Sequence, residues 1–119
     1  MSYKLFLDDI RTVDMVFKNM SDNEFIIVRS YEDFVSVIVE KGLPEFISFD
    51  NDLGLAADGE VAPDGYAAAK WLVYESGLNL SDLKFYVHSA NPVAAQQIKG
   101  LLNNYINFLT RSNDDLEQQ

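Results

Sequence analysis

Cysteine is absent from this chain of 119 residues. Its absence excludes disulfide bonds, thiolate metal sites and a cysteine nucleophile. It also suits a reducing compartment, although by itself it says little about location. No apolar run approaches the roughly 20 residues that a membrane-spanning helix needs. The first residues lead directly into an apolar segment, without the longer apolar stretch and cleavage site of a signal peptide. From these features together we expect a cytoplasmic protein.

Basic residues are scarce: the chain has 9 of them against 19 acidic ones, for a net charge of −10. Such a surface repels duplex nucleic acid and anionic membranes, and no basic stripe in the sequence offsets that repulsion. A small phosphate-containing ligand remains compatible with this charge, because a bound cation inverts the local field. We therefore expect a small phosphate compound as partner, with neither duplex nucleic acid nor membrane. The sequence does not indicate the oligomeric state.

Apolar residues, by contrast, are plentiful. They make up 48% of the chain, a share typical of globular proteins, and the length is enough for one domain with a core of its own. The sequence shows no internal repeat and no linker. We expect a single domain over residues 1–111, followed by a polar, disordered tail over residues 112–119.

Short apolar runs alternate with segments of helical spacing. The runs predict buried strands at residues 3–7, 25–28, 46–49 and 83–87. Helices are expected where capping residues precede the helical spacing, after Ser30, after Asp64 and after Asn91. A weaker helix is expected around residues 13–19, and residues 106–110 fit either the end of the last helix or a short strand.

This alternation is typical of a parallel sheet that is covered on both faces. We predict an α/β fold of the flavodoxin-like or receiver-like kind, a three-layer sandwich with a central parallel sheet of four to five strands. In the flavodoxin-like order 2-1-3-4, the first, third and fourth strands are neighbours, and ligands bind outside their carboxyl ends.

Acidic residues stand at those ends. Asp8 and Asp9 follow the first strand, and Asp50 and Asp52 follow the third. Adjacent strands lie about 4.8 Å apart, so we predict that Asp8, Asp9 and Asp50 bind one divalent cation, Mg²⁺ or Mn²⁺, with Ca²⁺ also fitting oxygen ligands. Without a cation, at least one of these carboxyl groups should have a raised pKa. A single Asp after a strand is usually a turn or cap residue; two pairs on adjacent strands favour the metal.

His88, the single histidine, stands at the end of the fourth strand. A histidine in an apolar strand is often a packed core residue. At this edge it also suits a general acid that protonates a leaving oxygen, with its pKa raised by the nearby carboxylates. We take His88, Asp50 and Asp52 as the candidate catalytic residues, with Asp52 supporting the metal or orienting a water. For His88 both interpretations stay open.

Three further polar residues are candidates for binding a phosphate. Arg11 follows the first acidic pair and suits a two-pronged grip on phosphate oxygens, or equally a surface pair with Asp14. Ser89 and Asn91 precede the last helix, where side chains and backbone N–H groups bind anions. Asn91 is also a good N-cap residue.

Three motifs of the chain resemble a known family. They are Leu-Phe-Leu-Asp-Asp-Ile-Arg at residues 5–11, Phe-Ile-Ser-Phe-Asp-Asn-Asp-Leu-Gly at residues 46–54 and Tyr-Val-His-Ser-Ala-Asn-Pro at residues 86–92. Together with residues 64–66 and 70–72, they resemble the cyclic-phosphate-processing receiver-like domains, stand-alone relatives of response-regulator receivers found in bacteria and phages. The resemblance runs from Leu5 to about Asn104.

The resemblance implies a receiver fold whose acidic pocket processes cyclic phosphates, in RNA-end or nucleotide metabolism. Carried over by position, the implied site residues are Asp8, Asp9, Arg11, Asp50, Asp52, His88 and Asn91. Asn51 departs from the family, because many relatives have histidine there. Asp50 matches the phospho-acceptor of ordinary receivers. However, no convincing lysine ends a fifth strand and the helix after the first strand is short, which speaks against a normal phosphorelay switch.

Three functional hypotheses follow. The first is a metal-dependent phosphoesterase that acts on a cyclic phosphodiester, either a cyclic nucleotide or the cyclic-phosphate end of an RNA. The second is a non-catalytic signalling module phosphorylated at Asp50. The third is a protein that binds a cyclic nucleotide without turnover. Only His88 and the missing lysine separate the first from the second, and the sequence does not separate the first from the third.

Overall fold

The computed structural model of the chain describes residues 2–53 and 64–117. Within these residues the strands and helices occur in the following order: β1 (Lys4–Leu7), the 3-10 helices η1 (Val13–Met15) and η2 (Asp22–Glu24), β2 (Ile26–Val28), α1 (Tyr31–Lys41), β3 (Phe46–Phe49), α2 (Gly65–Tyr74), β4 (Lys84–Val87) and α3 (Pro92–Glu117). All four predicted strands and the three main predicted helices are present.

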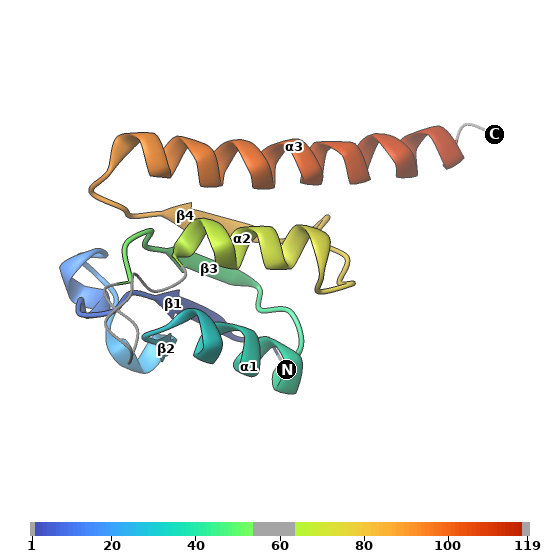
Figure 1. Cartoon of the computed structure of the whole chain (residues 1–119). Coiled ribbons are helices and arrows are strands. Elements are labelled where there is room, and N and C mark those ends of the chain that lie inside the picture. Colours follow the sequence, from blue (N-terminus) through green and yellow to red (C-terminus); the bar gives the residue numbers. More distant parts are fainter. Residues whose placement is uncertain (1, 54–63, 118–119) are drawn as a thin grey trace.

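The four strands form one parallel sheet in the order β2-β1-β3-β4 (Figure 1). Leu7 of β1 pairs with Val28 of β2 on one side and with Phe49 of β3 on the other, and Phe49 pairs with Val87 of β4. The carboxyl ends of β1, β3 and β4 therefore lie side by side. The sheet confirms the predicted receiver-like, flavodoxin-like fold class, with four strands.

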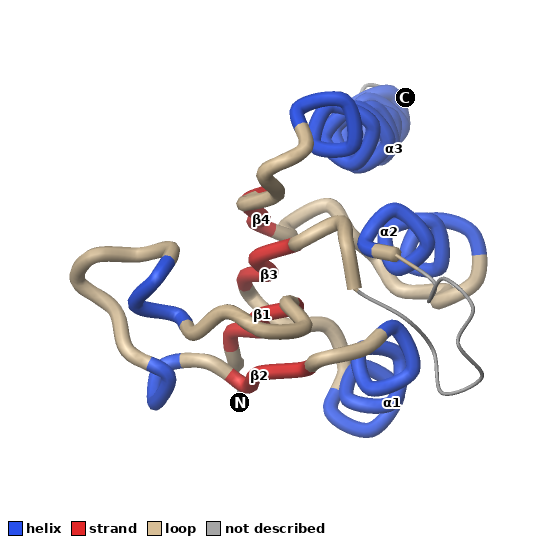
Figure 2. The backbone as a smooth tube through the Cα atoms, turned by 60° about the vertical axis from the view of Figure 1, so that its left-hand side comes forward, coloured by secondary structure: helices blue, strands red, loops and turns tan. Residues whose placement is uncertain are grey.

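The three α-helices cover one face of this sheet (Figure 2). Alternate strand residues point to that face and pack with the apolar sides of the helices into the main hydrophobic core. Its fully buried members include Leu5, Leu7, Phe34, Ile38, Ile47, Phe49, Leu72, Ile98 and Leu102. This core is continuous from α1 to α3.

The opposite face is covered by the chain between β1 and β2, which contains only η1 and η2 (Figure 2). A small aromatic cluster lies under it, with Phe6, Val13 and Phe25 buried and the Phe17 ring against Phe25. The helix expected around residues 13–19 is thus a single 3-10 turn, because this segment lacks the apolar period that an α-helix needs. The third layer of the predicted sandwich consists of 3-10 turns and loop.

The predicted caps set where the helices begin and end. The Ser30 side chain accepts a hydrogen bond from the Asp33 N–H at the start of α1, and Asp64 does the same for Ala67 at the start of α2. Gly42 ends α1 with a φ of 85°, a backbone conformation that glycine adopts without strain.

Helix α3 extends beyond the rest of the domain (Figure 1). Residues 106–110 continue this helix and do not form a strand. The helix also includes residues 112–117, which the sequence analysis assigned to a disordered tail. Among the described residues, none of the helices is both long enough and apolar enough to span a membrane.

Candidate functional site

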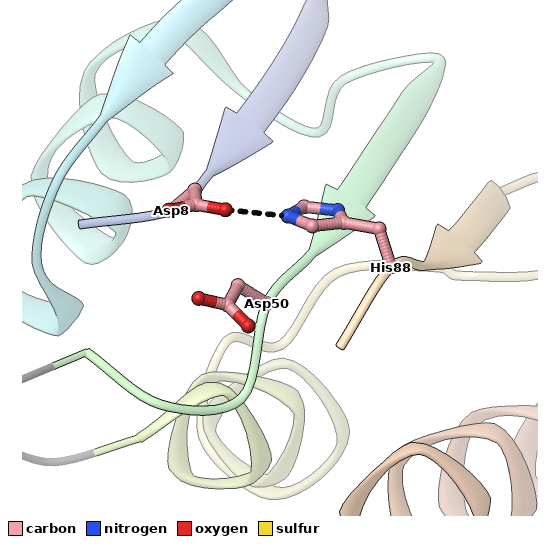
Figure 3. A group of neighbouring side chains, drawn as sticks. All are labelled: Asp8, Asp50 and His88. Carbon is pink, nitrogen blue, oxygen red and sulfur yellow. Dashed lines mark hydrogen bonds and ion pairs between the residues drawn. The ribbon is translucent and has the colours of Figure 1, made fainter. Parts of the chain in front are cut away.

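Asp8, Asp50 and His88 meet at the carboxyl edge of the sheet (Figure 3). The sheet hydrogen bonds continue one residue past the strands: the Asp50 N–H donates to the Leu7 carbonyl and the His88 N–H to the Phe49 carbonyl, both at 2.9 Å. These two bonds hold the three residues in one row across β1, β3 and β4. The edge that the sequence analysis singled out is therefore a real cluster of side chains.

Asp8 is fully buried. One of its oxygens, Oδ1, accepts hydrogen bonds from the backbone N–H groups of Ile10 at 2.9 Å and Arg11 at 2.8 Å. The other, Oδ2, lies 3.0 Å from Nε2 of His88. Burial acts to raise the pKa of Asp8, but the hydrogen bonds from Arg11, Ile10 and His88 outweigh it and hold the pKa below its usual value. Asp8 is thus an ionised, rigidly oriented carboxylate.

His88 lies between two partners and does not face solvent. Its side chain is 3% exposed, Nδ1 lies 2.6 Å from Oγ of Ser48, and the ring stacks on Phe6 at a centroid distance of 4.9 Å. Burial lowers the pKa of His88 and outweighs Asp8, which acts to raise it. Asp8 thus acts in the expected direction, but the expected net rise of the pKa was wrong because burial outweighs it, and the depth of burial is not visible in the sequence.

These contacts indicate one tautomer of the neutral ring. An ionised Asp8 accepts a hydrogen bond and cannot donate one, so Nε2 of His88 carries the proton that it shares with Asp8. Nδ1 then accepts the hydroxyl proton of Ser48, whose side chain is fully buried. Ser48, His88 and Asp8 form a continuous hydrogen-bonded chain from β3 to β1.

The pKa of Asp50 is shifted in the opposite direction to that of Asp8. It is 7% exposed, and its Oδ1 accepts a hydrogen bond from the Asn51 N–H at 2.9 Å. Burial and the negative charge of Asp8 raise the pKa of Asp50 to about 6, against the opposing effect of that hydrogen bond. The prediction that one of the clustered carboxyl groups has a raised pKa is confirmed for Asp50.

The cluster offers ligand atoms for a cation. Asp8, Asp50 and His88 each have one candidate ligand atom, and the three atoms lie within 4.8 Å of one another. Because Nε2 of His88 donates to Asp8 and Nδ1 accepts from Ser48, the ring offers no free lone pair in this tautomer, and the two carboxylates are the available ligands. The two carboxylates fit the oxygen preference of Mg²⁺ and Mn²⁺. The repulsion that raises the pKa of Asp50 is the kind that a divalent ion relieves. Asp9, the third predicted ligand, lies outside this cluster but lines the crevice beside it.

That crevice, of about 340 Å³, is lined by Asp9, Ile10, Arg11, Asp50, Asn51, Asp52, Ser89, Ala90 and Asn91. It brings together most of the predicted site residues. Arg11 donates to the His88 carbonyl at 3.1 Å, with its Nε 3.9 Å from Asp8. Asp14, its alternative partner, accepts a hydrogen bond from Thr12. Arg11 therefore lies at the crevice, in contact with His88 and Asp8.

Ser89 and Asn91 reach the crevice from the turn before α3, and both also have structural roles. The Asn91 side chain accepts hydrogen bonds from the N–H groups of Val93 and Ala94, as an N-cap. Ser89 accepts one from the Asn91 N–H. The capping interpretation of Asn91 is confirmed. Its position in the crevice is compatible with a second contact, to a ligand.

Two residues at the site were missed by the sequence analysis. Ser48 orients His88, and Arg29 donates to the backbone carbonyls of Asp8 at 3.0 Å and Arg11 at 2.6 Å, bracing the loop after β1. Ser48 had a signal: it is the one polar residue in an apolar strand, and a buried hydroxyl needs a partner. Arg29 had none, because its partners are backbone atoms.

Gly65 and Asn51 fix α2 against the site. A Cβ at Gly65 would lie 2.0 Å from the Asp50 carbonyl oxygen, so the helix begins directly on the backbone of that residue. The Gly65 N–H donates to the Asn51 carbonyl at 2.8 Å, and the Asn51 side chain accepts from the Tyr66 N–H at 3.3 Å. Asn51 therefore holds the start of α2.

Comparison with known protein families matches residues 3–104 to the cyclic-phosphate processing receiver domain. No curated protein matches the chain. Among solved structures, one described as amino acids 181–211 of the yeast Spc42 trimeric coiled coil fused to another structure is similar at 15% identity and a TM-score of 0.53, over 98% of this chain and 84% of that one. At this identity the similarity concerns the fold alone.

Proposed function

The chain belongs to the family of cyclic-phosphate processing receiver domains, and on this premise we propose that it is a metal-dependent phosphoesterase that opens a cyclic phosphodiester. The observation that carries the proposal is the pair of buried carboxyl groups, Asp8 and Asp50, held against His88 beside a crevice that also contains an arginine. Buried carboxylates repel each other at a free-energy cost, and a bound cation offsets that cost.

Asp8 and Asp50 would hold the ion, and Asp9 would complete its ligands from the crevice wall. Asp8 is ready for this role because its orientation is already fixed by the Ile10 and Arg11 N–H groups. A bound Mg²⁺ or Mn²⁺ supplies positive charge that neutralises phosphoryl oxygens and positions a nucleophile. The remaining steps belong to the residues of the chain.

Arg11 is the residue that we assign to the phosphate. Its side chain is 34% exposed and lies in the crevice wall, where a guanidinium group can grip two phosphate oxygens. Ser89 and Asn91 also line the crevice and add hydrogen-bonding groups. Asp52, exposed at the crevice, would orient the attacking water. Asp50 is the alternative nucleophile, because it stands where receivers accept a phosphoryl group.

For His88 the geometry favours a positioning role. Its Nε2 donates to Asp8 and its Nδ1 accepts from Ser48, so a direct proton transfer to a leaving oxygen would first require the ring to leave one of them. We therefore assign His88 to holding Asp8 in its metal-binding orientation, which is the effect that groups behind metal ligands have in many sites.

The substrate class is a small cyclic phosphodiester, either a cyclic nucleotide or the cyclic-phosphate end of a short RNA. The test is incubation of the protein with 2′,3′-cyclic nucleotides and short cyclic-phosphate-ended RNAs, with Mg²⁺, with Mn²⁺ and with a chelator. We expect ring opening that needs the metal and falls at least 100-fold in Asp8→Asn, since charge-stabilising groups at reacting centres contribute about 10²–10³. Absence of turnover with every substrate and metal would contradict the proposal.

Two other outcomes would assign a different function. Tight binding of a cyclic nucleotide without turnover would make the protein a binder. Covalent labelling by a small acyl phosphate, lost in Asp50→Asn and without any hydrolysis of cyclic phosphates, would make it a signalling module. His88→Gln adds a check on the positioning role: metal affinity and turnover should fall together, whereas a general acid would affect turnover alone.

A further inference from the structure

A second cavity adjoins the crevice on the side of the 3-10 turns. Its volume is about 330 Å³, and it is lined by Arg11, Met15, Val16, Tyr86, Val87, His88 and Ser89. Arg11 and Ser89 also line the crevice, so the two cavities lie next to each other and meet at these two residues. A ligand whose phosphate lies against Arg11 therefore has room to extend toward Tyr86.

Two of the large side chains that line this second cavity, Tyr86 and Met15, face solvent. Tyr86 is 48% exposed although its ring lies 5.6 Å from that of Phe17, and Met15 is 70% exposed. Single exposed apolar residues are ordinary on protein surfaces. Here an aromatic ring and a thioether line one cavity that shares Arg11 and Ser89 with a candidate phosphate site, and that combination suits a ligand with a flat apolar face.

We propose that this second cavity is a nucleobase subsite, in which the base of a small nucleotide stacks on Tyr86 beside Met15 while its phosphate lies in the crevice. The inference rests on the proposed function and makes its substrate class narrower. Stacking on an aromatic ring accepts any base, because every base has a π-face, and a methionine sulfur adds a favourable contact with aromatic rings. The subsite should therefore bind purine and pyrimidine nucleotides alike.

The thin layer over this face makes the subsite accessible. Tyr86 belongs to the row of side chains that includes Phe6 and Ser48 on the neighbouring strands, which point away from the α-helices. The turns η1 and η2 bury Phe6 and Phe25 but leave Tyr86 half exposed. A net charge of −10 disfavours a long polyanion, so a mononucleotide is the form that fits best.

The test compares ligands with and without a base in the presence of Mn²⁺; the affinity is taken from calorimetry where a ligand is not turned over and from KM in initial-rate assays where it is. The ligands are 2′,3′-cyclic AMP, 2′,3′-cyclic CMP and glycerol cyclic phosphate, which has the cyclic phosphodiester alone. We expect Tyr86→Ala to weaken the binding of both nucleotides by about 5- to 150-fold, the range measured for loss of one stacked base, and to leave the binding of glycerol cyclic phosphate unchanged. Tyr86→Phe should keep the affinity, because the ring remains.

Two further variants provide a control and an independent test of the subsite. Tyr74→Ala removes a tyrosine that is 71% exposed on another part of the surface, and it should change no affinity. Met15→Ala removes an exposed side chain without touching the core, so it tests the subsite even if Tyr86→Ala does not fold. It should weaken the binding of both nucleotides by about 2- to 10-fold and leave the binding of glycerol cyclic phosphate unchanged.

The outcomes separate this inference from the proposed function. If the wild type binds nucleotides no more tightly than glycerol cyclic phosphate, or if the Tyr86→Ala and Met15→Ala variants weaken all ligands equally or none, the subsite is overturned while the cyclic-phosphate site stands. If the wild type binds none of the three ligands, both proposals fall.

Discussion

The two faces of the sheet differ in what they bury. The face under α1, α2 and α3 buries aliphatic and aromatic side chains in one continuous core. The face under η1 and η2 buries a much smaller aromatic cluster, and Ser48 points into this side toward His88. Among the described residues, Asp8, Ser48 and Asp50 are buried polar residues and the side chain of His88 is 3% exposed; all four lie on this second face or at the sheet edge.

One face of the sheet therefore contributes most of the stability, and the other holds the candidate site. Burial of large apolar side chains is the main favourable contribution to folding, and the helical face holds most of them. The other face is covered thinly enough to hold a hydrogen-bonded polar chain and to leave a cavity open beside the site. Four predictions test this division, from the largest expected effect to the smallest.

Truncating one phenylalanine on each face is the most direct comparison. Phe49 is fully buried on the helical face, whereas Phe25 is 8% exposed under the 3-10 turns. We expect Phe49→Ala to lower the free energy of unfolding by about 4–5 kcal/mol and Phe25→Ala by about 2–3 kcal/mol, because loosely held turns can close on a cavity better than packed helices can. Urea unfolding measures both values. Equal losses would contradict the proposed division.

Gly65 tests how tightly α2 is held against the site. In Gly65→Ala the new Cβ would overlap the Asp50 carbonyl oxygen, at 2.0 Å, so the helix or the strand end must move. We expect a loss of about 3 kcal/mol, at the upper end of overpacking effects, with a matching loss of metal affinity. Gly100→Ala is the control, since a Cβ there meets no atom within 4 Å. Full stability of Gly65→Ala would mean that α2 can shift freely.

Ser48 tests the polar chain. In Ser48→Ala the buried Nδ1 of His88 loses its partner, and we expect a loss of about 1–3 kcal/mol from one buried group left without a hydrogen bond. Ser36→Ala, an exposed serine in α1, should change stability by less than about 0.5 kcal/mol. Nitrogen NMR shifts of the imidazole should report the Nε2–H tautomer in the wild type. The opposite tautomer would contradict the assigned direction of the hydrogen bonds from Ser48 through His88 to Asp8.

Asp50 gives the smallest effect and a pH dependence. Its pKa in the folded protein is raised to about 6, so the proton stabilises the fold at low pH and this stabilisation is lost as the pH rises through 6. Without divalent ions, Asp50→Asn should therefore exceed the wild type in stability by about 1–2 kcal/mol at pH 7–8, allowing for solvent in the crevice, and the gain should vanish toward pH 4.

Thermal unfolding in the presence of a chelator measures this difference across pH. Asp82→Asn, at an exposed carboxylate, provides the control and should show no such trend. Added Mn²⁺ should stabilise the wild type more than Asp50→Asn, because a ligand that binds only the folded state raises its stability. A gain of Asp50→Asn that grows on acidification would show that the sign of the shift is wrong.

Much of the fold was predictable from local signals. The strands are short apolar runs, the caps at Ser30 and Asp64 are individual side chains, and alternation of strands and helices predicts a parallel sheet. The segment between β1 and β2 was not predictable, because its apolar residues follow neither the helical nor the strand period. Its 3-10 turns are held by tertiary contacts of Val13 and Phe25.

The position of the candidate site was predictable, but its hydrogen bonds and pKa shifts were less so. Asp8, Asp50 and Arg11 follow from their places at strand ends. The direction of the His88 pKa does not, since it depends on a burial that arises from tertiary packing, which includes the stack on Phe6. The bracing by Arg29 was invisible for a similar reason, because any backbone carbonyl can accept its hydrogen bonds.

Strand β4 stands at the end of the sheet, with β3 beside it and no further strand among the described residues. An outer strand of this kind is a template to which an extended segment of another molecule can add, which leads to aggregation. Here the strand has only four residues and begins with an exposed lysine, Lys84. Shortness and a charge are protections that natural proteins use against such association. Replacing Lys84 by an apolar β-branched residue would weaken this protection.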